Sequence, residues 1–322
     1  MMDGFAGPTQ MITVLTGGTG GAKLVWGLAQ IAPAEKLTVV VNTGDDLKWW
    51  GLHVSPDLDS VMYALAGKLS HDRGWGYDGD SFRCLDRMRS LGGESWFQLG
   101  DLDLATHLRR TQLLAGGKSL TEATAEICRV MGVKQRLLPM ADDPLQTMVS
   151  TPEGNLTFQE YFVRERWKPK VIDVKFRGEE NVLTAPGVLQ SIIHSDLILI
   201  APSNPVTSIG PILAVPGVRD ALRCTTAQVI AVSPIVGGVA VTGPAAEMLK
   251  MRGFSVSAAG VAEAYRDFVD VLIADSSDEA TRTDIESKDV QATFTNTIMR
   301  SDEDKIALAK FALTTVARET AR

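Results

Sequence analysis

The sequence predicts a Rossmann-like, doubly wound α/β fold, with a mainly parallel sheet and a mixed helical and hairpin insertion. Three observations predict it. Short apolar runs rich in β-branched residues alternate with segments of helical spacing, as in βαβ units. Most of these runs are apolar throughout, as expected of strands buried on both faces. Turns rich in glycine, serine or aspartate follow the runs, at the end of a parallel sheet where ligands bind.

The composition is that of a globular protein in a reducing, cytoplasmic setting. The chain has 322 residues, enough for one large α/β domain or two modest ones. Its net charge of -7 argues against nucleic-acid binding, and no apolar run approaches the length of a membrane span. The 3 cysteines are far apart, which favours neither a disulfide framework nor a zinc site. We predict a disordered lead-in over 1–10 and a single α/β domain over 11–322, with an insertion or cap at about 60–185.

The first predicted unit is a strand over 12–15, a glycine-rich turn from Thr16 to Gly21, and a helix. Glycines let a backbone approach a phosphate closely, and the N–H groups at a helix start point at the anion. The turn matches neither standard motif. Lys23 stands where the dinucleotide fingerprint has its third glycine, and Leu24 stands where a P-loop has Ser or Thr. We predict a phosphate-binding turn; the alternative is a plain glycine-rich βα turn.

A second buried strand is predicted over 37–41, and the next helix begins with Ser55 as its N-cap and Pro56 as its first residue. From there to about residue 132 the pattern is mostly helical, with breaks marked by glycines. An amphipathic helix over about 303–318 closes the chain. The remaining predicted strands cover 136–140, 147–150, 156–162, 171–176, 196–202, 229–232 and 271–274.

Four aspartates gather near the end of the second strand. Asp45 and Asp46 follow the strand, and Asp57 and Asp59 lie in the first turn of the next helix, whose dipole keeps them ionised. Carboxylates beside a diphosphate repel it unless a cation lies between them, and Mg²⁺ typically takes one or two protein carboxylates plus phosphate oxygens. A magnesium site is therefore one interpretation. The other is that Asp57 only caps its helix and Asp46 only fills a turn.

Other polar residues are candidates for ligand contacts. Asp103 can cap a helix that carries His107 one turn later, and His107 is either a ligand contact, a general base or a structural residue. Ser203 and Asn204 follow a predicted strand, where such loops hold a base or a phosphate, although ordinary turn chemistry explains them as well. Trp49, Trp50 and Trp75 are suited to stacking on a flat heteroaromatic ligand, or belong to the core of the cap.

Together and in this order, the motifs resemble those of the 2-phospho-L-lactate transferase family, which acts in the biosynthesis of coenzyme F420. The resemblance covers nearly the whole chain from Met11 onward. The motifs that carry it are TGGTGGAKL, VVNTGDD, GLHVSPDLDSVMYALAG, RGWG, LGDLDLATHLRR, LLPMADDP, APSNPVTSIGPILAVPG and AVSPIVGG.

The resemblance implies a transferase that takes a phospho-organic acid from a guanosine diphospho donor. The acceptor is the deazaflavin Fo, whose terminal ribityl hydroxyl attacks the phosphorus bearing the acid while GMP leaves. Family members transfer phospholactate, phosphoenolpyruvate or a phosphoglycerate, and these donors stay open here. The resemblance also implies a homodimer. The nearest rival is a nucleotide-sugar-binding regulatory protein of the same superfamily without transferase activity.

The resemblance also indicates roles for single residues. Asp59 matches a family aspartate at the deazaflavin site, and Gln98 stands where some members have a basic residue. We predict that Asp45, Asp46 and Asp59 are the catalytic residues and the Mg²⁺ ligands. The predicted substrate-binding residues are Gly17, Gly18, Thr19, Gly20, Asp57, Gln98, His107, Ser203, Asn204 and Ser208.

Overall fold

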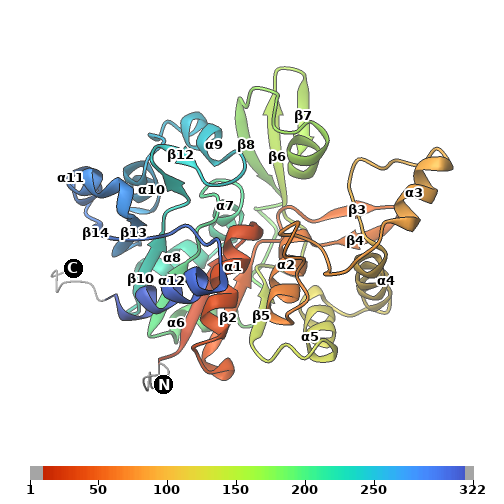
Figure 1. The fold of residues 1–322 in the computed structure, drawn as a ribbon, viewed down its shortest axis with the longest axis horizontal. Helices are drawn as coiled ribbons and strands as arrows, with labels where there is room; N and C mark the ends of the chain where they lie inside the picture. Colours follow the sequence, from red (N-terminus) through yellow and green to blue (C-terminus); the bar gives the residue numbers. More distant parts are fainter. Residues whose placement is uncertain (1–9, 316–322) are drawn as a thin grey trace.

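A computed structural model describes residues 10–315 and has a parallel sheet of seven strands at its centre (Figure 1). The strand order is β14-β13-β10-β9-β1-β2-β5. This confirms the predicted α/β fold with a mainly parallel sheet. The strands are β1 (Ile12–Thr16), β2 (Leu37–Val41), β5 (Arg136–Pro139), β9 (Leu197–Ile200), β10 (Gln228–Val232), β13 (Val271–Asp275) and β14 (Gln291–Thr295).

Strand β1 lies where the order of the sheet reverses. Ile12 pairs with Leu37 of β2 on one side and with Leu197 of β9 on the other. The chain passes from β1 to β2 first and reaches β9 only after the middle of the sequence. Ligands of open α/β sheets bind at such a reversal, beyond the carboxyl ends of the strands. The fold thus places the turn after Thr16 where a ligand is expected.

Helices cover both faces of the sheet (Figure 1). Val14 packs into the core on one face and Leu15 into the core on the other, so the central strands are apolar throughout. Between residues 10 and 315, no helix combines the length and the apolar character needed to cross a membrane. The helices of the Val14 face are α1 (Gly18–Ala29), α2 (Pro56–Leu65), α5 (Leu120–Val130) and α12 (Asp302–Thr314). Those of the Leu15 face are α6 (Val188–Ile193), α7 (Ile209–Ala214), α8 (Val218–Cys224), α9 (Ala245–Met251), α10 (Ala258–Tyr265) and α11 (Arg282–Glu286).

Two further groups of elements, which we call the hairpin cap and the helical cap, extend from the sheet (Figure 1). The hairpin cap is an antiparallel sheet of three strands in the order β7-β6-β8, with a π-helical turn over Glu160–Arg164. Its strands are β6 (Gln146–Thr151), β7 (Gly154–Thr157) and β8 (Asp173–Arg177). The helical cap consists of β3 (Leu47–Trp49), β4 (Leu52–Val54), α3 (Arg83–Ser90) and α4 (Asp101–Ala115).

The span 60–185, predicted as an insertion, contains one strand of the main sheet. β5 pairs with β2 in parallel, so the elements outside that sheet form two caps instead of one continuous block. The predicted strand over 156–162 is too long, because β7 ends at Thr157 and a π-helical turn follows. The predicted closing helix is α12, and its last predicted residues 316–318 lie outside the described range, as do residues 1–9 of the predicted lead-in.

Candidate active site

The glycine-rich turn joins β1 to α1 and is fixed by a serine from another strand end. The N–H of Gly17 donates to Ser203 Oγ at 3.2 Å, and that hydroxyl donates to the Gly17 carbonyl at 2.7 Å. A Cβ on Gly20 would lie 2.9 Å from the carbonyl oxygen of Pro202, so only glycine fits there without a shift. Gly18 and Thr19 begin α1 directly after this contact. The turns after β1 and β9 therefore form one loop pair at the switch point of the sheet.

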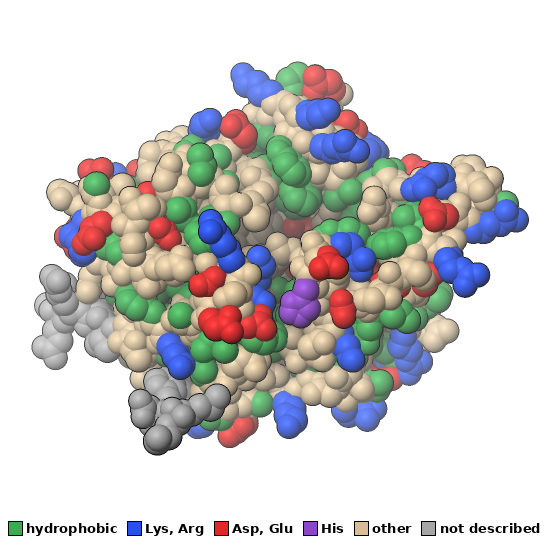
Figure 2. Space-filling model, viewed as in Figure 1, with side chains coloured by type: hydrophobic (Ala, Val, Ile, Leu, Met, Phe, Trp, Pro, Cys, Tyr) green, Lys and Arg blue, Asp and Glu red, His purple; other side chains and the backbone are tan. Residues whose placement is uncertain are grey.

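Two buried carboxylates face this loop. Asn42, directly after β2, donates its amide Nδ2 to Asp45 Oδ2 at 3.1 Å and to Asp57 Oδ2 at 3.0 Å. A Cβ on Gly17 would lie 2.7 Å from Asp57 Oδ2 and 2.9 Å from the Cβ of Ser208. One amide thus holds both acids, and the absence of a side chain at Gly17 lets the loop pack closely against Asp57. Figure 2 shows a hollow on this face of the molecule, with acidic side-chain atoms at its floor.

Burial makes these carboxylates hard to ionise. Burial first, and then the neighbouring charge of Asp57, raise the pKa of Asp45 well above its usual range. Burial raises the pKa of Asp57 to about 6, although hydrogen bonds from Asn42 and from the backbone of Gly18 favour its charged form. Such perturbed carboxylates at the ends of strands are a mark of functional sites.

The donor set at this site fits a divalent cation. Asp46 Oδ2 accepts a hydrogen bond from Ser55 Oγ at 2.7 Å and lies 2.9 Å from His53 Nε2. The other oxygens, Asp45 Oδ1 and Asp46 Oδ1, are buried and have no hydrogen-bond partner among residues 10–315. Buried oxygens left unpaired are costly, and carboxylate oxygens are the ligands that Mg²⁺ prefers. A cation at this place would satisfy both needs.

Asp59 belongs to a different cluster, on the side of α2 that faces α4. Both of its oxygens accept from the guanidinium of Arg110, with Nη1 to Oδ2 at 3.0 Å. His107 Nδ1 lies 3.5 Å from Asp59 Oδ2, and His107 Nε2 lies 3.4 Å from Asp103 Oδ1. That Asp103 oxygen also accepts the hydroxyl of Tyr63 at 2.7 Å. We call these five buried side chains the Asp59 network.

The predicted metal ligands Asp45, Asp46 and Asp59 do not converge in the structure. Within the described residues, the acidic and histidine side chains that offer ligand atoms within 4.8 Å of one another are Asp59, Asp103 and His107. The Arg110 guanidinium already occupies that group and neutralises Asp59. We therefore give more weight to the unpaired oxygens of Asp45 and Asp46 as the place for a cation.

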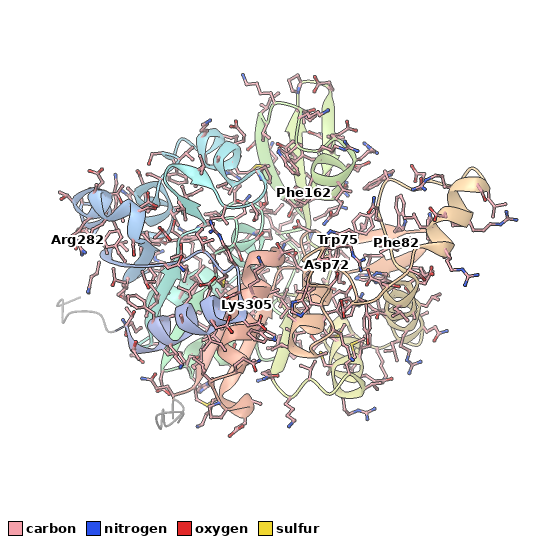
Figure 3. All side chains as sticks on the ribbon, viewed as in Figure 1. Asp72, Trp75, Phe82, Phe162, Arg282 and Lys305 are labelled. Carbon is pink, nitrogen blue, oxygen red and sulfur yellow. The ribbon has the colours of Figure 1, made fainter. Side chains whose placement is uncertain are left out.

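A small cavity lies beside the Asp59 network. Its volume is about 60 Å³, room for one or two water molecules. Asp59, His107 and the predicted Gln98 line it together with Trp75. The Trp75 ring packs edge to face on Phe82 at 6.4 Å between centroids (Figure 3).

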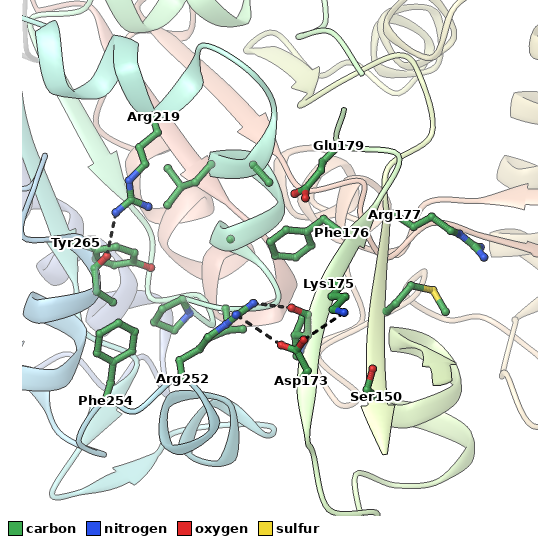
Figure 4. A pocket seen from close by; sticks show the side chains of 18 of the residues that line it. Ser150, Asp173, Lys175, Phe176, Arg177, Glu179, Arg219, Arg252, Phe254 and Tyr265 are labelled. Atoms are coloured by element: carbon green, nitrogen blue, oxygen red, sulfur yellow. Dashed lines mark hydrogen bonds and ion pairs between the residues drawn. The ribbon is translucent and has the colours of Figure 1, made fainter. Parts of the chain in front are cut away.

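A second and larger cavity lies elsewhere, between β8 and the helices of the Leu15 face (Figure 4). It measures about 910 Å³, and its lining includes Phe176, Arg219 and Arg252. An ion pair joins Arg252 to Asp173 across its rim at 3.7 Å. None of the predicted catalytic acids lines it. Because perturbed carboxylates indicate functional sites, we take the acids as the candidate active site.

Sequence reasoning found the acids but missed several of their partners. Asn42, which holds two acids, and Arg110, which holds Asp59, were not among the predicted site residues. Asp103, His107 and Arg110 follow the spacing i, i+4, i+7, which puts them on one face of α4 and could have revealed the network. Of the other predicted residues, Asn204 accepts the N–H of Val206 at 2.9 Å as a turn residue does, and Asp103 lies inside the helix that it was expected to cap.

Comparison with known proteins extends over nearly the whole chain. Residues 12–315 match the family model described as 2-phospho-L-lactate transferase CofD. The curated 2-phospho-L-lactate transferase of Methanosarcina acetivorans is 43% identical over 300 residues, covering 93% of this chain and 97% of that protein. That of Methanothermobacter thermautotrophicus is 41% identical over 303 residues, covering 94% and 97%.

Solved structures share the fold. Protein BH3568 from Bacillus halodurans matches with a TM-score of 0.65 at 15% identity, covering 95% of this chain and 100% of that one. A second structure of BH3568, described as a member of the UPF0052 family, gives a TM-score of 0.63 at 16% identity. Likeness at such low identity shows the fold alone, and function must come from the site. The sequence similarity decides the family: this chain belongs to the 2-phospho-L-lactate transferases.

Proposed function

We propose that this protein transfers a phospho-organic acid group, 2-phospho-L-lactate or phosphoenolpyruvate, from a guanosine diphospho donor to the terminal ribityl hydroxyl of the deazaflavin Fo, in coenzyme F420 biosynthesis. The hydroxyl oxygen forms a bond to the phosphorus that bears the acid. The bond from that phosphorus to the oxygen of GMP breaks, and the hydroxyl loses its proton. The family match over residues 12–315 is the observation that carries this proposal.

The loop pair at the switch point supports the donor half of the proposal. The backbone of Gly17 to Gly20 leads into the first turn of α1, where N–H groups favour an anion. Ser203 fixes the loop, and Gly17 lets it pack closely against Asp57. We assign the donor diphosphate to the first turn of α1, beside this loop.

Mg²⁺ is the proposed cofactor, with Asp45 and Asp46 as its protein ligands and Asp57 beside them. Their unpaired oxygens and the raised pKa values of Asp45 and Asp57 are the support. The ion, when bound, would neutralise charge on the diphosphate. Asn42 keeps Asp45 and Asp57 oriented toward the loop.

Asp59 is the proposed acceptor-site acid. It lines the small cavity, and the lone pairs that its bonds to Arg110 leave free suit a hydrogen bond from the acceptor hydroxyl. Its proposed role is to orient that hydroxyl.

The test offers the purified protein Mg²⁺, Fo and, in turn, the phospholactyl, phosphoenolpyruvyl and phosphoglyceryl guanosine donors, with products identified by mass. We expect GMP and one acid-bearing deazaflavin product. Chelation of divalent cations should stop the reaction and added Mg²⁺ should restore it. Binding of sugar nucleotides without any Fo binding would support the regulatory rival instead. The homodimer and the cytoplasmic location remain predictions.

The sharpest single variant is Asp59→Asn, which keeps the size of the side chain and removes its charge. We expect kcat to fall by about 100-fold or more, within the range that positioned acids and bases contribute. Circular dichroism and the unfolding midpoint control for folding. Turnover like that of the wild type would remove Asp59 from the acceptor site.

A further inference from the structure

Arg110 is the buried cation of the Asp59 network. Only 1% of its surface is exposed, and its guanidinium donates to both oxygens of Asp59. Asp59 itself is 4% exposed. The partners come from α4 and α2, 51 residues apart in sequence. The pair therefore ties the helical cap to the helix that carries the proposed acceptor-site acid.

The geometry of this pair fixes an orientation. Two parallel donors that bind two oxygens hold the plane of a carboxylate, which a single donor or a point charge does not. Arg110 Nη1 also lies 3.3 Å from His107 Nδ1. Because a guanidinium only donates, any hydrogen bond in that contact has Nδ1 as its acceptor, while His107 Nε2 lies 3.4 Å from Asp103 Oδ1. The contacts from Arg110 to His107 and from His107 to Asp103 thus complete the Asp59 network.

The pair is an expensive way to hold two helices together. A buried ion pair often contributes no more stability than apolar side chains of the same volume, because both charges lose their hydration. The orientation that it imposes on Asp59 is what an apolar pair would not supply. Asp59 and His107 line the small cavity, so this orientation decides which oxygen lone pairs face a bound acceptor.

We propose that Arg110 is a positioning residue, which holds the Asp59 carboxylate in the orientation that receives the acceptor hydroxyl. The inference rests on the proposed function and assigns Arg110 no contact with substrate. Arg110 acts only through Asp59.

A double-mutant cycle tests this claim. Arg110→Met, Asp59→Asn and the double variant are compared with wild type in kcat and in the KM for Fo. Arg110→Met should lower kcat by about 10- to 100-fold, as expected when a reacting group is misplaced by about 1 Å, with a smaller change in KM. In the Asp59→Asn background the same substitution should change kcat by less than about threefold, because its target is already lost. Arg110→Lys should keep part of the kcat that Arg110→Met loses.

The neighbouring Arg109 is the matched control. It lies on the same helix, its side chain is 54% exposed, and it pairs with Glu126 on the surface. Arg109→Met should leave kcat unchanged. If Arg110→Met alone does not fold, two other comparisons still test the positioning role. One compares kcat of Arg110→Lys with that of wild type, and the other compares kcat of the double variant with that of Asp59→Asn. The double variant can be used because it leaves no unpaired charge on either partner.

The outcomes separate cleanly. If the losses of kcat in the two single variants multiply in the double variant, or if Arg110→Met is fully active, the positioning role is overturned while the transferase proposal stands. A wild-type protein that transfers nothing to Fo would overturn the proposed function and this inference with it.

Discussion

At the scale of single residues, burial of the Asp57 carboxyl group lowers the stability of the folded state at neutral pH. Its folded pKa of about 6 exceeds its ordinary value of 3.8, because burial disfavours the charge. The folded state therefore holds this proton more tightly than the unfolded state does. Its contribution to stability is fully present below about pH 4 and is lost as the pH rises through 6.

Asp57→Asn removes this loss. The variant without ligands should be more stable than wild type above pH 6, by at most about 3 kcal/mol for a shift of about 2 pKa units. The difference should vanish below about pH 4. Urea unfolding at several pH values, without divalent cations, measures it. A stability difference that stays constant with pH would contradict the assignment, and reduced turnover in the variant is expected alongside.

Gly17 gives a second prediction at this scale. Its φ of -161° is open to any residue, so Gly17→Ala should act through space alone. The new Cβ would lie 2.7 Å from Asp57 Oδ2, so the loop next to the proposed diphosphate site must shift. We expect the KM for the donor to rise by about 10-fold or more, since a displaced binding group costs at least about 1.4 kcal/mol. An unchanged KM for Fo is the control, and an unchanged KM for the donor would argue against the assignment.

At the scale of elements, the sequence predicted what depends on continuous apolar runs. β1, β2, β9, β10 and β13 are buried on both faces and were predicted within a few residues. β14 is an edge strand with partly exposed residues, so it lacks such a run and was missed. The hairpin of β3 and β4 was missed because each strand has only three residues.

The candidate site divides in the same way. The acids stand beside predicted strand and helix ends, so residue type and position were enough to select them. Their partners are tertiary: the contact of Arg110 with Asp59 exists only because α4 packs near α2. Ser55 is the N-cap residue of α2 as predicted, but its side chain makes no capping hydrogen bond, and its hydroxyl donates to Asp46.

The crossing of α1 and α12 gives a prediction at the element scale. A Cβ on Gly27 would lie 2.3 Å from the carbonyl oxygen of Lys305, so the two helices touch through their backbones. Gly27→Ala should destabilise the protein by about 1 to 3 kcal/mol through overpacking, despite the better helix propensity of alanine. Chemical unfolding measures this, and the KM for the donor should stay unchanged. A gain in stability would show that α12 moves aside freely.

At the scale of the whole molecule, the proposed site combines the main sheet with the helical cap. The main sheet supplies the glycine loop and Asp45, while the helical cap supplies His107 and Arg110. The caps also touch each other, with Arg164 of the hairpin cap over the ring of Trp96 at 5.6 Å. A ligand that bridges these parts should stabilise all of them together.

GDP with Mg²⁺ should therefore raise the thermal unfolding midpoint of the whole protein. At 100 times the dissociation constant the gain is about 2.7 kcal/mol, which corresponds to a shift on the order of 5 °C. Asp45→Asn should remove the part of the shift that depends on Mg²⁺ and keep the part that GDP gives alone. A Mg²⁺-dependent shift that survives this substitution would place the cation elsewhere.

The contact of Gly17 with Ser203 has a consequence for the order of events during synthesis. The two residues stand 186 positions apart, and the serine belongs to the turn after β9. A growing chain that has already made its glycine loop must wait for more than half of the protein before that loop can be held in shape. Binding at the proposed donor site should thus appear late, when β9 enters the sheet beside β1.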